Sequence, residues 1–265
     1  QAQAVTGRDS NRAPTGASTM SNAIGMDAVK AGGISETGRP AIVVQDGTIE
    51  ALKWLGVVLM TLDHINKYFF NETLPGIFEL GRLTMPIFGF VLAYNLARPG
   101  CLAKGVYGRT MKRMALYGLL ATPFYIILGA GQLAFGWFPL NIMAMLFVAT
   151  ASLYLVELGG RRAILAAEVV FLLGGILGEF WWIGQAVVMT AWWYFRSGRH
   201  IALVSVIVAT ALLFVINRNF YAVFSIVLLV GAQYANVRIP RLKNIFYAYY
   251  TLHLAVLCGI HKIYY

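Results

Sequence analysis

Long apolar stretches separated by short polar loops run through the chain from residue 51 to its end. An α-helix needs about 20 mostly apolar residues to cross the ~30 Å hydrocarbon core of a membrane. The pattern therefore predicts an all-α, polytopic helical membrane protein with about nine transmembrane helices. Two neighbouring stretches, the fifth and sixth, are also compatible with a re-entrant hairpin. We place the nine stretches near residues 51–70, 80–98, 113–131, 139–158, 162–178, 180–196, 200–216, 219–236 and 245–262.

The first 48 residues differ from the rest of the chain. They are rich in Gly, Ala, Ser and Thr and lack hydrophobic periodicity, which is typical of segments that cannot form a packed core. We expect residues 1–48 to form a flexible cytoplasmic tail and residues 49–265 to form the membrane bundle.

Composition supports the membrane assignment. The chain is 59% hydrophobic and 12% charged, whereas soluble domains carry about 25% charged residues. The net charge of +10 comes from basic residues in short loops, and these loops alternate with nearly neutral ones. By the positive-inside rule, this alternation places the N-terminus in the cytoplasm and the C-terminus outside. No basic stripe with interleaved aromatics is present, so we predict no nucleic-acid partner.

The two cysteines, Cys101 and Cys258, lie in a basic loop and an apolar stretch. Neither belongs to a CxxC pair or a His/Cys cluster, so the sequence predicts neither a disulfide nor a metal site.

The first apolar stretch carries Asp63, His64 and Lys67. Ionisable groups at membrane depth cost about 2.5–3.5 kcal/mol each on insertion scales and are candidates for function. Adjacent side chains project about 100° apart on a helix, whereas residues four apart share a face. Asp63 is therefore expected either to orient His64 or to neutralise Lys67. A helix–helix hydrogen bond is the structural alternative for His64.

The last apolar stretch contains a second candidate cluster. Tyr249 and Tyr250 precede His253 by four and three residues, so the three side chains share a helical face. Such a group can orient a polar substrate or relay a proton. An interfacial aromatic belt with a hydrogen-bonded histidine is the alternative.

Single polar residues mark other stretches. Arg82, at the start of the second, is suited to bind a carboxylate or phosphate or to anchor the helix at the interface. Asn141 is a polar residue at the start of the fourth. Glu168 lies inside the fifth and is a stronger candidate for function than Glu179, which lies in a short turn.

Three segments together resemble the TraX family of conjugal transfer proteins, most closely its TrbP-type members. They read LKWLGVVLMTLDHINKYFF, LGRLTMPIFGFVLAYNL and FYAYYTLHLAVL. The resemblance covers about residues 50–262. It implies a bacterial inner-membrane protein that acts on pilin, since the type member N-acetylates the pilin N-terminus. It also implies acetyl-CoA as co-substrate, and pilin and other conjugative transfer membrane proteins as partners.

The resemblance also assigns roles to residues. The LDH motif places the histidine role on His64 with Asp63 beside it, the GR motif places an arginine on Arg82, and the last segment places a second histidine on His253. Family members commonly read Tyr-Pro-x-His in the last segment, whereas this chain has Thr251 in place of the proline. A straighter helix at His253 is expected.

Our leading hypothesis is a membrane-embedded acyltransferase in which His64 is the general base. The rival hypotheses are a non-catalytic component of pilin or mating-pair assembly, and a proton-coupled transporter using Asp63, His64 and Glu168. The acyltransferase requires a passage through the bundle, because His64 falls in the outer half and acetyl-CoA is cytoplasmic. The candidate residues are His64, Asp63 and His253 for catalysis and Arg82, Tyr249, Tyr250 and Asn141 for substrate binding.

Overall fold

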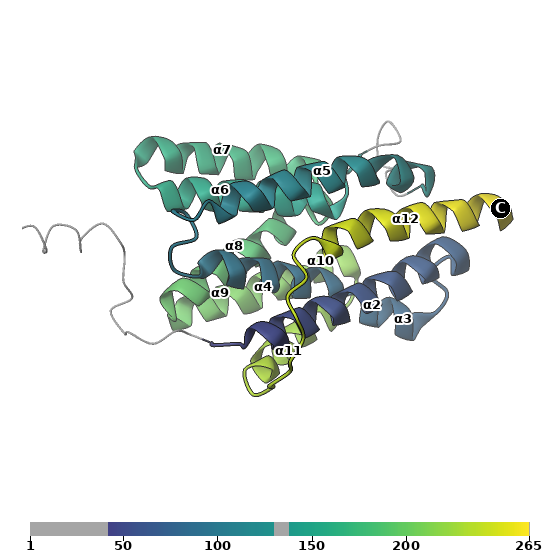
Figure 1. The fold of residues 1–265 in the computed structure, drawn as a ribbon, viewed down its shortest axis with the longest axis horizontal. Helices are drawn as coiled ribbons and strands as arrows, with labels where there is room; N and C mark the ends of the chain where they lie inside the picture. The colour runs from purple at the N-terminus through teal and green to yellow at the C-terminus, as the bar shows by residue number, and fades with distance from the viewer. Residues whose placement is uncertain (1–41, 130–137, 265) are drawn as a thin grey trace, which may run out of the picture. The chain divides into compact units, whose positions relative to one another are not determined.

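The computed structural model describes residues 42–129 and 138–264, and Figure 1 shows their helices. Within these ranges the chain is all-helical, apart from an isolated bridge between Leu140 and Gly178. A helix occupies each of the nine predicted stretches. The elements are α2 (Asp46–Phe70), α3 (Pro75–Gly81), α4 (Thr84–Ala97), α5 (Val106–Ile127), α6 (Ile142–Leu158), α7 (Arg161–Leu177), α8 (Trp181–Ser197), α9 (His200–Leu212), α10 (Phe214–Asn217), η1 (Tyr221–Val223), α11 (Phe224–Ala232) and α12 (Ile245–Tyr264).

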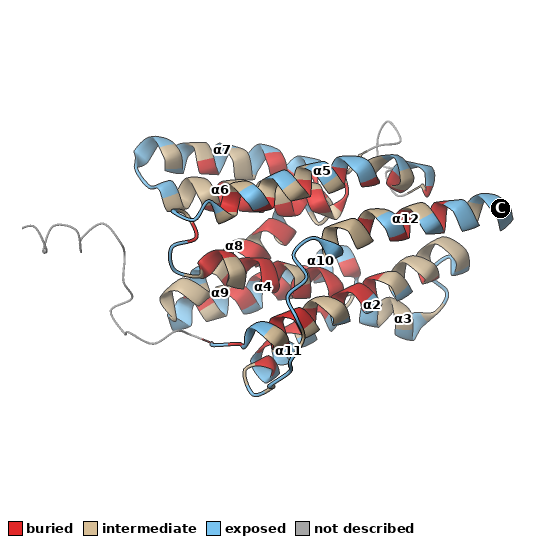
Figure 2. Ribbon diagram, viewed as in Figure 1, coloured by how far each residue is buried: buried red, intermediate tan, exposed pale blue. Residues whose placement is uncertain are grey.

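Six helices pack in a closed ring. In order around it, α2 contacts α4, α4 contacts α8, α8 contacts α6, α6 contacts α5, α5 contacts α12, and α12 returns to α2. The remaining long helices lie outside: α7 covers α6 and α8, while α9 packs on α8. The burial colours in Figure 2 follow this order, since α4 is mostly buried and α7 is largely exposed. The ring therefore brings α2 and α12 side by side.

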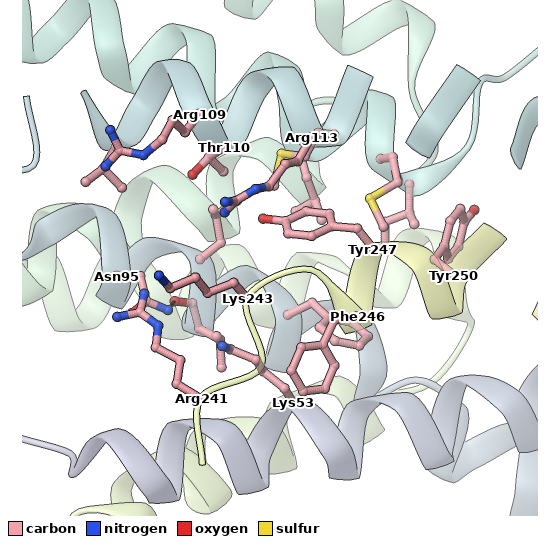
Figure 3. A pocket seen from close by; sticks show the side chains of 18 of the residues that line it. Lys53, Asn95, Arg109, Thr110, Arg113, Arg241, Lys243, Phe246, Tyr247 and Tyr250 are labelled. Carbon is pink, nitrogen blue, oxygen red and sulfur yellow. Dashed lines mark hydrogen bonds between the residues drawn. The ribbon is translucent and has the colours of Figure 1, made fainter. Parts of the chain in front are cut away.

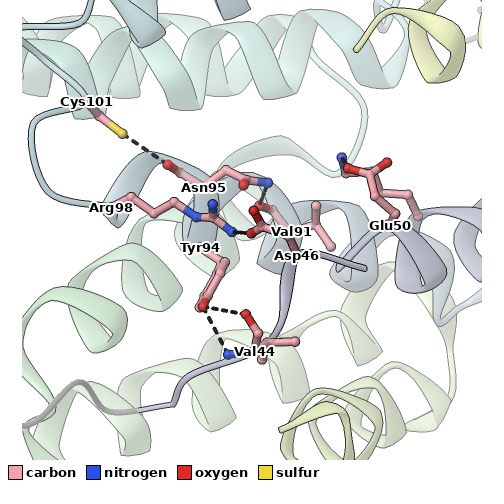
Figure 4. Close-up of polar contacts among 9 residues, drawn as sticks. Val44, Asp46, Glu50, Val91, Tyr94, Asn95, Arg98 and Cys101 are labelled. Atoms are coloured by element: carbon pink, nitrogen blue, oxygen red, sulfur yellow. Dashed lines mark hydrogen bonds and ion pairs between the residues drawn. The ribbon is translucent and has the colours of Figure 1, made fainter. Parts of the chain in front are cut away.

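The beginning of α2 is fixed to the end of α4 (Figure 4). The Tyr94 hydroxyl donates to the carbonyl of Val44 and accepts from its N–H, both at 3.0 Å. Arg98 pairs with Asp46 in the first turn of α2, where a carboxylate also favours the helix dipole. These contacts hold one end of the ring together.

Two segments in the described residues are long and apolar enough to cross a membrane by length and composition alone, Pro75–Ala97 and His200–Asn217. Others are shorter or more polar: α6, α7 and α8 have 17 residues each, about 26 Å at 1.5 Å per residue. The helical class is thus confirmed, while nine membrane crossings stay a prediction.

The packed body of the protein begins earlier in the sequence than the predicted boundary at residue 49. Residues 1–41 lie outside the described residues. Ile42 and Val44 are buried in the hydrophobic core, and α2 begins at Asp46. Residues before 49 therefore belong to the body of the protein, because Ile42 and Val44 are part of its hydrophobic core.

Close packing of α6 and α7 depends on Gly174. A methyl group there would lie 2.3 Å from Cγ1 of Val148. We expect Gly174→Ala to destabilise the protein by about 1–3 kcal/mol, the usual cost of overpacking a tight contact. Thermal unfolding of the purified protein measures this, with Gly259→Ala as control because nothing lies within 4 Å of a Cβ there. Equal unfolding temperatures for the two variants would contradict the packing.

Candidate functional site

Two histidines that lie far apart in the sequence meet inside the ring. Nδ1 of His64 on α2 lies 2.7 Å from Nε2 of His253 on α12. The two rings are nearly parallel, with centroids 5.0 Å apart. His253 is buried, and its other ring nitrogen, Nδ1, lies 3.0 Å from the carbonyl oxygen of Tyr249. The two candidate histidines, which the sequence marks in separate motifs, are therefore in direct contact.

Hydrogen-bond chemistry fixes the tautomers of this pair when both rings are neutral. A carbonyl oxygen only accepts, so Nδ1 of His253 must carry a proton and its Nε2 must accept. Nδ1 of His64 then carries the proton that it donates to His253. This leaves Nε2 of His64 without a proton, and no described residue bonds to it. An imidazole nitrogen in this state can accept a proton, as a general base must.

Asp63 pairs with Arg82 rather than with Lys67 or His64. Nη2 of Arg82 donates to Oδ1 of Asp63 at 2.6 Å, and both side chains are less than one-fifth exposed. Nε of Arg82 also donates to the carbonyl oxygen of Phe78 at 3.1 Å, and the guanidinium lies over the Phe78 ring. Lys67 lies over the Tyr68 ring instead. The prediction that Asp63 neutralises Lys67 by direct pairing is wrong, because the α3–α4 junction brings Arg82 closer.

The close approach of that junction depends on Gly81, the last residue of α3. A Cβ at this position would lie 2.2 Å from Oδ1 of Asp63. Glycine next to Arg82 therefore allows the ion pair to form.

Asp63, His64, Gly81 and Arg82 line one cavity of about 240 Å³, which we call the histidine cavity, whereas His253 is not part of its lining. Two of its buried side-chain oxygens, Oγ1 of Thr84 and Oδ1 of Asn217, have no hydrogen-bond partner among the described residues. Such atoms are costly to bury unpaired, which favours a polar ligand in the cavity. Its lining includes Met60, Asp63, His64, Lys67, Glu72, Gly81, Arg82, Thr84, Tyr125, Ile142, Glu179, Asn217 and Tyr250.

Glu179 is placed better for function than its position in a short turn of the sequence indicates. It lies in the turn between α7 and α8, lines the histidine cavity, and accepts a hydrogen bond from Tyr125 at 2.7 Å. Burial raises the pKa of Glu179 above its usual range, against the opposing effect of the Lys67 charge. Glu168, the stronger candidate by sequence, is exposed on α7. The sequence signal for Glu179 is a carboxylate flanked by apolar residues.

The other predicted binding residues have distinct positions. Tyr250 is buried and lines the histidine cavity. The Tyr249 hydroxyl lies 2.8 Å from Oγ1 of Thr61, so this contact ties α12 to α2. Asn141 caps α6 by accepting from the Met143 N–H. Its amide group also donates to Thr122 and to the carbonyl of Gly118, and these bonds favour a structural role over contact with substrate.

Comparison with known proteins agrees with the motifs. The model of the family described as TraX protein matches residues 48–261. An uncharacterised protein of Rickettsia prowazekii is 34% identical over 80 residues, which are 30% of this chain and 27% of that protein. The chain thus spans about a quarter of the length of this relative. No solved structure matches the chain. Since the family match covers most of the sequence, the chain belongs to the TraX family of membrane proteins related to conjugal transfer.

Proposed function

We propose that this protein is a membrane-embedded acyltransferase that acetylates pilin during conjugative pilus production. The observation that carries the proposal is the His64–His253 pair, which leaves an unprotonated imidazole nitrogen beside a cavity with polar walls. The donor we propose is acetyl-CoA and the acceptor is the N-terminal amine of pilin.

The reaction needs one proton acceptor at the amine. As the amine nitrogen attacks the thioester carbonyl, a C–N bond forms, the C–S bond breaks, and the amine proton passes to Nε2 of His64. That proton then returns to the departing sulfur, so an amide and a free thiol are the products. His253 would stabilise the positive charge on His64 by accepting from its Nδ1, because its own Nδ1–H stays bonded to the Tyr249 carbonyl.

The ion pair of Asp63 and Arg82 would position α2 against the α3–α4 junction. Thr84 and Asn217 would supply hydrogen-bond partners for the acceptor chain. Holding both reactants beside the base supplies much of the rate acceleration in such reactions.

The placement in the inner membrane is part of the proposal. We propose nine helical passes with the N-terminus in the cytoplasm. Large apolar side chains on the outward surfaces of α7, α9 and α11 support contact with lipid, since contiguous exposed apolar surface is rare on soluble proteins. Examples are Leu165, Leu173, Ile201, Val208 and Val227, each more than half exposed.

The direct test is the mass of pilin. Pilin is purified from conjugative donor cells that carry this protein and from cells that lack it, and intact masses and N-terminal peptides are compared. We expect one acetyl group on the N-terminal residue only when the protein is present. Identical pilin masses, with pilus assembly still dependent on the protein, would reject the enzyme and favour a non-catalytic assembly component.

A further inference from the structure

A second cavity, of about 490 Å³, lies between α2, α4, α5, α6 and α12. Figure 3 shows basic side chains from three separate segments around it. Lys53 comes from α2, Arg109 and Arg113 come from α5, and Arg241 and Lys243 come from the connection that leads into α12. We call this space the cationic cavity.

Acidic side chains compensate only part of the positive charge of this cavity, although Asp46 lies close enough to Arg241 and Lys53 to interact with both. Its described lining contains five basic residues and no acidic one. Glu50, close by, pairs with Lys53 at 2.5 Å. Arg109 donates to the backbone carbonyl of Lys104, which leaves its charge intact. Like charges gathered in a cleft with low-dielectric walls attract anions strongly.

Beyond the charged rim, the wall of the cationic cavity is apolar. It is formed by Phe88, Leu92, Met114, Met143 and Leu146 among others. A ligand that fills both parts must combine a highly anionic head with a long, weakly polar arm.

The two cavities are neighbours inside the ring. Met60, Ile142 and Tyr250 line both of them, and we call these three residues the neck. Lys53 at the charged rim and His64 beyond the neck are eleven positions apart on α2, about 16 Å along the helix. A passage through the neck would connect the cationic cavity to His64, as an acyltransferase with a cytoplasmic donor requires.

We propose that the cationic cavity binds a ligand that carries two or more phosphates on an extended arm, and that the arm reaches through the neck toward His64. The site rests on the proposed function, because it places the donor of that reaction. Arginine pairs with phosphate through two parallel hydrogen bonds, and lysine contributes a point charge. Two kinds of molecule have this chemistry, a soluble coenzyme A thioester and a lipid-linked diphosphate.

Basic residues on the cytoplasmic side also determine membrane topology. The control variant must therefore remove the same number of positive charges from that side. Arg161 and Arg162 are exposed at the start of α7 and line neither cavity. By the predicted topology they lie on the same side of the membrane as Arg241 and Lys243. The double variants Arg241→Gln/Lys243→Gln and Arg161→Gln/Arg162→Gln therefore remove equal charge from the same face.

Binding to the purified full chain in lipid nanodiscs separates these variants. The probes are free coenzyme A, inorganic pyrophosphate, and nanodiscs doped with a polyprenyl diphosphate. We expect Arg241→Gln/Lys243→Gln to weaken coenzyme A binding at least tenfold and Arg161→Gln/Arg162→Gln to change it less than twofold. Competition of coenzyme A by pyrophosphate would support a soluble donor, and competition by the doped lipid alone would support a lipid donor.

Equal affinities for all three probes in both double variants would overturn the site. His64→Ala keeps the experiment separate from the proposed function, because it should bind coenzyme A normally. Binding without any pilin acetylation would reject the proposed function and keep the site. Acetylation that is unaffected in Arg241→Gln/Lys243→Gln would reject the site and keep the function.

Discussion

Replacing His64 by alanine is expected to lower pilin acetylation by about 10²–10⁴-fold, the usual contribution of a general base. The variant removes the unprotonated nitrogen at the histidine cavity and leaves Nε2 of His253 without its donor. The measurement is the initial rate of acetyl transfer to a pilin N-terminal peptide by membranes that contain equal amounts of each variant.

The matched control is His200→Ala, because His200 is exposed at the start of α9 and lines neither cavity. It should retain the full rate. A rate for His64→Ala equal to that of the control would remove His64 from the chemistry even if acetylation itself is real. Thermal unfolding of both variants separates lost chemistry from lost structure.

Gly81→Ala is expected to lower the same rate by about 10²-fold, although glycine carries no chemical group. Its new methyl group would overlap Oδ1 of Asp63, so Asp63 must move away from Arg82. Displacing a supporting group by about 1 Å has effects of this size in other enzymes. The strained contact is also expected to cost about 1–3 kcal/mol of stability.

Gly76→Ala is the control for this variant. Gly76 lies on the same short helix, α3, and nothing lies within 4 Å of a Cβ built there. If Gly81→Ala and Gly76→Ala transfer acetyl groups at the same rate, the ion pair of Asp63 and Arg82 has no part in positioning the site.

The sequence was enough to predict the helices and the residues of the histidine pair. Nine apolar stretches mark nine helical regions because burial in lipid or in the bundle leaves a strong compositional signal. His64 and His253 were recognisable because ionisable groups are rare within such stretches. Their direct contact was not predictable from periodicity, since it depends on α12 closing the ring against α2.

Other parts of the site depend on contacts that one-dimensional patterns do not contain. Lys67 is the nearest cation to Asp63 on the same helix face, yet Arg82 binds Asp63 because a short helix, α3, turns the chain back. Glu168 and Glu179 both interrupt apolar sequence, and only the helix packing decides which one faces a cavity. The basic residues of the cationic cavity come from three segments. In the sequence, the positive-inside rule explains these residues equally well, so the cavity was not predictable.

The neck also matters for the proton gradient across the membrane. In the proposed placement, the two cavities face opposite sides of an energised membrane, and an ion leak between them would dissipate the proton gradient. Met60 and Ile142 are uncharged and apolar, and Tyr250 is buried between the two cavities. A narrow apolar constriction excludes hydrated ions by dewetting. A slender carbon chain holds no tightly bound water, so it can occupy the same space. In the proposed function, an acyl group would therefore cross the centre of the protein while the neck keeps ions out.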